Sequence, residues 1–160
     1  MSRRLALPLL LVLLLPATAL AGPPWITIEL PANPWDAATR GAFLVVHAYH
    51  HGTPMGAPLT GTADGIVRGQ RKHLTLAFEP AGRAGVYTLR KQWEDGGRWV
   101  LRLTVSQGDH ADGDVAEALV VIGEDGHVTG VTVPTSAEHG GRFPRRVTQA
   151  ELDAALRGPR

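Results

Sequence analysis

A histidine-rich segment is the part of the sequence whose residue types could bind a metal. His47, His50 and His51 lie within five residues, and Met55 follows four residues later. Imidazole and thioether groups are suitable ligands for copper, and imidazole also suits zinc. The segment is therefore a candidate copper or zinc site, with an ordinary run of polar aromatic residues at a strand end as the competing interpretation.

The spacing of these residues limits how they could act together. In a strand that rises roughly 3.3 Å per residue, His47 and His51 would share a face about 13 Å apart, and His50 would point the other way. His51 and Met55 could approach each other if Gly52-Thr-Pro54 folds the chain back. A complete ligand set would still need histidines from elsewhere in the chain, with these candidates: His73, His110 and His127.

Other catalytic or metal-binding patterns are absent from the sequence. There is no Cys, which removes thiol catalysis and zinc–thiolate sites. Ser106 and Ser136 stand outside any Gly-x-Ser-x-Gly turn. The segment 109–114 has its second carboxylate at position 4, where a calcium-binding EF-hand loop needs ligands at positions 1, 3 and 5, so a solvated loop is expected. We therefore expect no enzyme and no resident cofactor.

The four tryptophans divide into expected core and expected surface residues. Trp99 begins a run of alternating apolar residues and is expected in the core, with Trp93 beside it across a turn. Trp35 lies within Asn-Pro-Trp-Asp, between two turn-forming residues, and is the tryptophan expected to be most exposed. It is the candidate residue for a ligand-binding face.

These residues must be positioned by an all-β fold. Short alternating apolar runs recur between Gly, Pro and Asp, a pattern typical of strands, over residues 25–30, 42–50, 73–79, 86–93, 98–105, 116–122 and 128–133. The pairs Asp95-Gly96 and Asp125-Gly126 each predict a hairpin. We predict an immunoglobulin-like two-sheet sandwich of about seven strands, with a small barrel as the alternative.

The ends of the chain have different expected roles. Residues 1–21 have the three parts of a cleavable signal peptide: Arg3-Arg4, the apolar run 5–15 and the small residues around Ala21. The β-sandwich is expected over 22–134 and a polar linker over 135–147. A short C-terminal helix is predicted over 148–157, because Thr148 and Glu151 form a capping box.

Removal of the signal peptide changes the charge of the protein. The full chain has 16 Lys and Arg against 15 Asp and Glu, and the signal holds two of the arginines. The mature chain is thus near neutral and has no basic excess that would attract nucleic acid. The expected location is periplasmic or secreted, with no membrane span after cleavage.

Two short motifs resemble a known family. Gly85-Val-Tyr87, followed by the run Gly97-Arg-Trp-Val-Leu-Arg-Leu103, is similar to exported bacterial β-sandwich domains of the YtkA-like kind, over roughly residues 24–105. The resemblance implies an immunoglobulin-like envelope domain, often associated with metal-efflux or oxidase-assembly machinery. Together these observations predict a non-catalytic accessory or binding module whose partner is another envelope protein, with a periplasmic copper- or zinc-binding protein as the alternative.

Overall fold

The computed structural model describes residues 24–107, 115–138 and 141–158, and the predicted signal peptide lies outside them. The described residues form twelve strands and one helix: β1 (Trp25–Glu29), β2 (Leu44–His50), β3 (Thr53–Pro54), β4 (Leu59–Val67), β5 (Gln70–Thr75), β6 (Glu79–Pro80), β7 (Val86–Leu89), β8 (Gly97–Ser106), β9 (Val115–Ile122), β10 (Val128–Thr132), β11 (Thr135–Glu138), β12 (Gly141–Pro144) and α1 (Gln149–Arg157). The all-β sandwich with a short C-terminal helix is confirmed, although its strands outnumber the seven expected.

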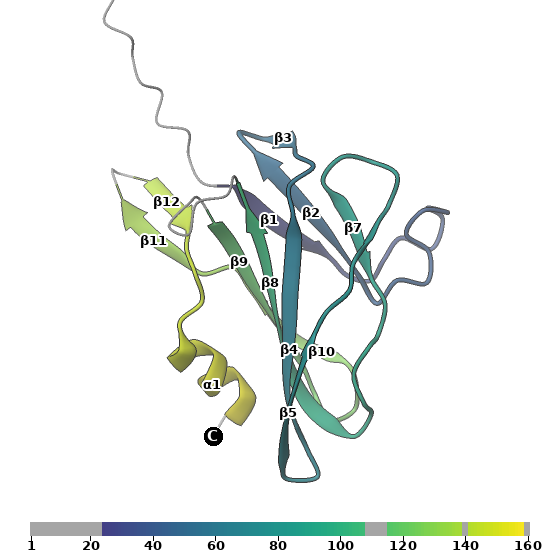
Figure 1. Ribbon diagram of the computed structural model, residues 1–160, viewed down its shortest axis with the longest axis vertical. Coiled ribbons are helices and arrows are strands. Elements are labelled where there is room, and N and C mark those ends of the chain that lie inside the picture. The colour runs from purple at the N-terminus through teal and green to yellow at the C-terminus, as the bar shows by residue number, and fades with distance from the viewer. Residues whose placement is uncertain (1–23, 108–114, 139–140, 159–160) are drawn as a thin grey trace, which may run out of the picture.

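Two sheets make up the sandwich (Figure 1). Sheet A has the order β1-β2-β7-β6, with β3 also paired to β2, and sheet B has the order β10-β9-β8-β4-β5. Neighbouring strands within each sheet are antiparallel. Strands β11 and β12 form a separate two-stranded sheet.

The core lies between the inner faces of sheets A and B. Alternate residues of β8 point inward, as predicted, and Trp99, Leu101, Leu103 and Val105 are fully or almost fully buried. They meet apolar residues of sheet A, including Ile26, Leu44, Val46, Ala48 and Leu89. Burial of these side chains is the main source of stability available to a chain without disulfides.

Strand β4 was not predicted from the sequence. It pairs along its length with β8 and also with β5, so it is an interior strand of sheet B, next to the edge strand β5. Its two glycines hide the apolar alternation that marks a strand. Gly65 is needed because a Cβ atom there would lie 2.4 Å from the indole of Trp99, the residue directly opposite on β8.

The two predicted Asp-Gly hairpins have different outcomes. Asp125-Gly126 does connect two paired strands, β9 and β10. The hairpin predicted at Asp95-Gly96 is wrong, because β7 belongs to sheet A and β8 to sheet B. Trp93 lies between β7 and β8, where the chain passes from sheet A to sheet B. It is buried against Phe43, with ring centroids 4.9 Å apart.

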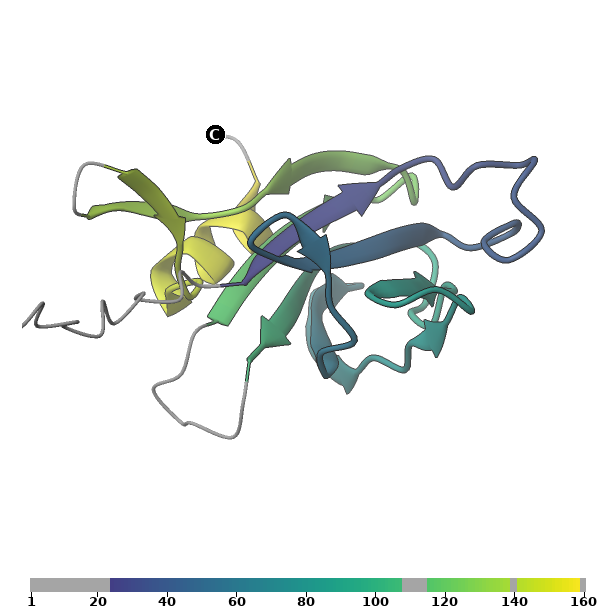
Figure 2. The same ribbon diagram turned by 90° about the horizontal axis from the view of Figure 1, so that it is seen from above.

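The segment predicted as the linker 135–147 contains the hairpin of β11 and β12. Its polar and glycine-rich sequence obscures the strands, which are linked by the register Thr135↔Pro144 and by hydrogen bonds of 2.9 and 3.1 Å from Arg142 to Thr135. In Figures 1 and 2 this hairpin stands at one edge of the molecule.

Helix α1 packs on the outer face of sheet B. Thr148 and Glu151 form the predicted capping box. Leu152 and Leu156 are buried with Val147 against Val100 of β8 and Leu119 of β9, which form a second, smaller core. Figure 2 shows the yellow helix beside the green strands of sheet B. Within the described part of the chain, no helix is long and apolar enough to cross a membrane.

Candidate functional site

The histidine-rich segment forms a tight hairpin at the end of β2. Strand β2 ends at His50, and His51 and Gly52 turn the chain with φ values of 50° and 75°. Strand β3 then runs back along β2, with Tyr49 opposite Pro54 and His50 opposite Thr53. Such a two-residue loop with positive φ suits the twist of a hairpin. The chain therefore folds back after His51, as the metal hypothesis required.

The side chain of His47 lies on the outer face of sheet A, where it contacts Glu29 and Tyr49. Its Nε2 lies 3.0 Å from Oε2 of Glu29, and its ring is nearly parallel to that of Tyr49 at a centroid distance of 6.3 Å. Glu29 also accepts a hydrogen bond from the amide of Asn33. This amide bond and the contact with His47 lower the pKa of the Glu29 carboxyl below its usual value.

The remaining predicted metal ligands divide into a pair and a core residue. The rings of His50 and His51 meet edge to face, with centroids 4.2 Å apart. Met55 is half-buried and packs against the core between the sheets, while its amide donates to the carbonyl of Ala48. The structure thus brings His50 and His51 together without His47.

Among the residues that the structure describes, histidines from elsewhere in the chain do not complete a ligand set. His73 lies on β5, where its Nδ1 is 3.2 Å from Asp64. His127 follows the β9–β10 turn, and His110, with the acidic segment 109–114, lies outside the described residues. Over the residues that the structure describes, no three or more His, Cys, Asp or Glu side chains are grouped so that they could hold a metal ion.

Trp35 is the most exposed large apolar residue of the described chain, with 90 % of its surface accessible. It belongs to the loop of residues 31–43 between β1 and β2, which we call the Trp35 loop. In Figures 1 and 2 this violet-blue loop extends on the side of the molecule away from α1. The exposure predicted from the Asn-Pro-Trp-Asp sequence is therefore confirmed.

Hydrogen bonds fix the backbone on both sides of Trp35. The amide of Trp35 donates to Oδ1 of Asn33 at 2.9 Å, and the amide of Ala38 donates to Oδ1 of Asp36 at 3.0 Å. Arg83 reaches across from another loop to Oδ2 of Asp36 at 2.6 Å. The Ala38 amide, followed by the charge of Arg83, lowers the pKa of Asp36.

The roles of Asn33 and Asp36 were not identified from the sequence. Asn and Asp often accept hydrogen bonds from amides two residues ahead, so the Asn-Pro-Trp-Asp pattern contained a usable signal. The ion pair with Arg83 joins segments 47 residues apart and leaves no such local pattern.

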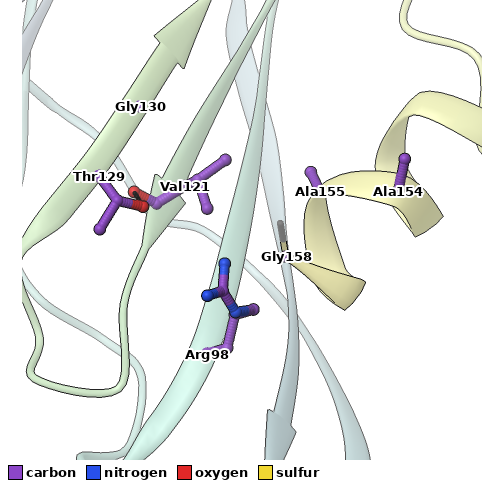
Figure 3. Close-up of a pocket in the computed structure, with 7 residues that line it drawn as sticks. All are labelled: Arg98, Val121, Thr129, Gly130, Ala154, Ala155 and Gly158. Carbon is purple, nitrogen blue, oxygen red and sulfur yellow. Dashed lines mark hydrogen bonds between the residues drawn. The ribbon is translucent and has the colours of Figure 1, made fainter. Parts of the chain in front are cut away.

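A pocket of about 440 Å³ lies between α1 and sheet B. Figure 3 shows Ala154 and Ala155 of the helix on one side, Val121 and Thr129 on the other, and the guanidinium of Arg98 between them. The hydroxyl of Thr129 is directed to the carbonyl of Val121 at 3.4 Å. The lining is mostly apolar, with a single charged group, and presents no acid–base pair.

Comparison of the chain with family models, with curated proteins and with solved structures gave no match.

Proposed function

We propose that this protein is an exported, non-catalytic module that binds another envelope protein, and that the Trp35 loop is its contact surface. The observation that carries the proposal is a tryptophan with 90 % of its surface accessible on a loop with a hydrogen-bonded backbone. The signal-peptide pattern of residues 1–21 supports export. The resemblance of residues 24–105 to YtkA-like domains stays a prediction and points to the same class.

A partner would gain binding energy from Trp35 at low entropic cost. Tryptophan is among the residues that contribute most at protein interfaces, because its large ring fills a pocket of the partner. A loop held in place before binding loses little conformational freedom on binding. Asn33 and Asp36 supply that order by fixing the amides of Trp35 and Ala38.

Site-specific photocrosslinking in the producing cell tests this proposal. A photoreactive phenylalanine derivative replaces Trp35 in one variant and Trp25 in a matched control, since Trp25 is also exposed, at 40 %, but lies in β1. We expect one discrete crosslinked envelope protein from position 35 and none from position 25. The captured protein is then identified and purified for a direct binding measurement.

The binding measurement decides between the outcomes. We expect Trp35→Ala to weaken binding of the purified partner about 30-fold, because loss of an interface tryptophan typically reduces the binding free energy by about 2 kcal/mol. Asp36→Ala should weaken binding less, because it loosens the loop without removing the ring. Equal affinity of Trp35→Ala and the unaltered protein, or identical crosslinks from both positions, would refute the proposal.

A periplasmic copper- or zinc-binding role is the second candidate, favoured by the contact between the His50 and His51 rings. Its test is titration of the mature protein with Cu²⁺ or Zn²⁺. The metal role requires a dissociation constant below about 1 μM, with a marked loss in His51→Ala and little change in His127→Ala. Weaker binding, or binding unaffected by His51→Ala together with Met55→Ala, would exclude it.

A further inference from the structure

A second pocket, of about 370 Å³, lies on the outer face of sheet B beside the segment that leads into α1. Its lining combines hydroxyl groups with two guanidinium groups and one carboxylate: Thr60, Gly61, Thr62, Thr75, Arg102, Thr104, Glu117 and Arg146. We call it the threonine–arginine pocket. It is separate from the Trp35 loop and from the histidine hairpin.

Strand register explains why these side chains converge. Thr75, Thr62 and Arg102 are directly opposite one another across β5, β4 and β8. One row along, Thr60, Thr104 and Glu117 are opposite one another across β4, β8 and β9. Residues opposite each other in antiparallel strands share a face of the sheet. The two rows of polar side chains therefore lie on one face of sheet B, and the hydrogen-bonded strands hold their backbones in place.

The carboxylate of Glu117 already has its partners within the protein. Glu117 is only 5 % exposed, and its Oε2 accepts a hydrogen bond of 2.6 Å from the amide of Val147. Its Oε1 accepts from the hydroxyl of Thr104 at 3.2 Å and lies 3.9 Å from Nη1 of Arg146. Glu117 therefore holds the pocket wall in place, and little of its charge remains for a ligand.

The guanidinium of Arg102 and the hydroxyl of Thr62 have no hydrogen-bond partner among the described residues. Arg102 is half-buried, and the structure gives its guanidinium neither a hydrogen bond nor an ion pair with any described residue. The hydroxyl of Thr62, directly opposite on β4, is buried and has no hydrogen-bond partner. Buried hydroxyls are normally hydrogen-bonded, so Thr62 is an exception, and the guanidinium of Arg102 on the neighbouring strand is available to a ligand that accepts hydrogen bonds.

From this arrangement we infer that the threonine–arginine pocket binds a small ligand through an oxyanion, a carboxylate or a phosphate, held by Arg102 with threonine hydroxyls as further donors. Guanidinium pairs with both oxyanions through parallel hydrogen bonds. The volume is at the lower end of the range for small-molecule sites, about 300–1,000 Å³. A divalent cation is disfavoured, since the unpaired charge is positive.

Nuclear magnetic resonance titration of the full mature chain tests the inference. The probes are inorganic phosphate, citrate as the carboxylate, and glucose as an uncharged control, at constant ionic strength. Backbone and arginine side-chain signals of β4, β8 and β9 around Arg102 should shift in a saturable manner with phosphate or citrate, at a dissociation constant below about 10 mM. The stronger of the two probes identifies the oxyanion.

Three variants locate the site. Arg102→Gln should weaken binding about tenfold or more, because it removes a charge-assisted pair. Thr62→Val keeps the shape but removes the hydroxyl, and should weaken binding by a smaller factor. Arg98→Gln is the matched control, since Arg98 is half-buried on the same strand and face but lines the pocket beside α1.

The affinities of the variants decide whether the threonine–arginine pocket binds the oxyanion. Saturable binding that is lost in Arg102→Gln and kept in Arg98→Gln supports it, provided the variant retains the wild-type spectrum away from the pocket. If Arg102→Gln does not fold, Thr62→Val decides alone. Shifts that do not saturate, equal responses to glucose, or the same affinity in both arginine variants would overturn it.

Discussion

The Trp35 loop and the threonine–arginine pocket, the two proposed binding regions, are built in opposite ways. Trp35 extends from a loop whose order comes from local amide bonds and one ion pair, those of Asn33, Asp36 and Arg83. The pocket is built on four paired strands and bordered by the segment before α1, whose Val147 amide is hydrogen-bonded to the buried Glu117.

This difference predicts how closely each region is coupled to folding. The segment before α1 belongs to the second apolar core through Val147, which is buried there together with Leu152 and Leu156 of α1. The Trp35 loop meets buried residues at its ends, where Ala32 and Ala42 pack beside Val45 and Phe43 packs against Trp93, whereas Trp35 itself is 90 % accessible. Changes around the pocket should therefore alter the stability of the whole domain, whereas removal of the exposed Trp35 ring should leave that stability almost unchanged.

Removal of Glu117 should give the largest effect. In Glu117→Ala the buried amide of Val147 loses its acceptor, and the link between β9 and the segment before α1 is broken. We expect the free energy of unfolding to fall by about 2 kcal/mol, the usual range for a buried hydrogen bond to a charged group. Urea unfolding of the mature chain measures it.

Glu124→Ala is the control for this prediction, because Glu124 is an exposed carboxylate in the β9–β10 turn. Its free energy of unfolding should match that of the unaltered protein. A Glu117→Ala variant as stable as the Glu124→Ala variant would show that the pocket wall is not coupled to folding, and the contrast between the two regions would disappear.

The sequence allowed prediction of those parts of the fold that depend on local patterns. The apolar alternation of β8, the Asp125-Gly126 turn and the capping box of Thr148 and Glu151 all correspond to observed features. Strand β4 was missed, because Gly65 is selected by the indole of Trp99, a residue 34 positions away. The Asp95-Gly96 hairpin failed because a turn signal does not reveal which sheet the next strand joins.

The candidate sites, too, could be predicted only where they depend on local sequence. The exposure of Trp35 could be predicted, since its neighbours Asn33 and Asp36 favour turns within a few residues. The position of Arg102 opposite Thr62 could not, because it depends on the register of a strand that the sequence did not reveal. Met55 is a metal-ligand candidate by residue type, and its packing against the core as a half-buried side chain could not be predicted from spacing alone.

Lowering the pH should reduce the free energy of unfolding through Glu151, at the start of α1, by less than Glu117→Ala does. Arg145, which lies 2.7 Å from Glu151, and then the amide and hydroxyl of Thr148 lower the pKa of Glu151 from 4.5 to about 2. A lowered pKa stabilises the fold above the unfolded value, and this contribution is lost as the pH falls from 4.5 to about 2. Because both side chains are 37 % exposed, solvent screening keeps this contribution smaller than that of the buried Glu117 carboxylate.

Glu151→Gln isolates this contribution. The difference in unfolding free energy between the unaltered protein and Glu151→Gln should be constant above about pH 5 and shrink toward zero near pH 2. Glu124→Gln corrects for the titration of ordinary carboxylates. A difference that does not change with pH would mean that Arg145 and Glu151 do not form the pair in solution.

The smallest effect on stability is expected from Trp35→Ala. With 90 % of its surface accessible in the folded protein, Trp35 buries almost no area on folding, so its removal should change the free energy of unfolding by less than about 0.5 kcal/mol. Trp25→Ala is the matched comparison and should lose somewhat more, because Trp25 is 40 % exposed and lies opposite Tyr49. Thermal and urea unfolding of both variants measure the difference.

A loss of more than about 1.5 kcal/mol in Trp35→Ala would mean that the ring packs against the folded protein, since exposed substitutions rarely reach that size. In that case the loop would be part of the fold, and the contrast with the pocket would fail. Unchanged stability has a further consequence, because any weaker partner binding by Trp35→Ala then arises at the contact itself. The indole would be free to serve binding because the fold does not depend on it.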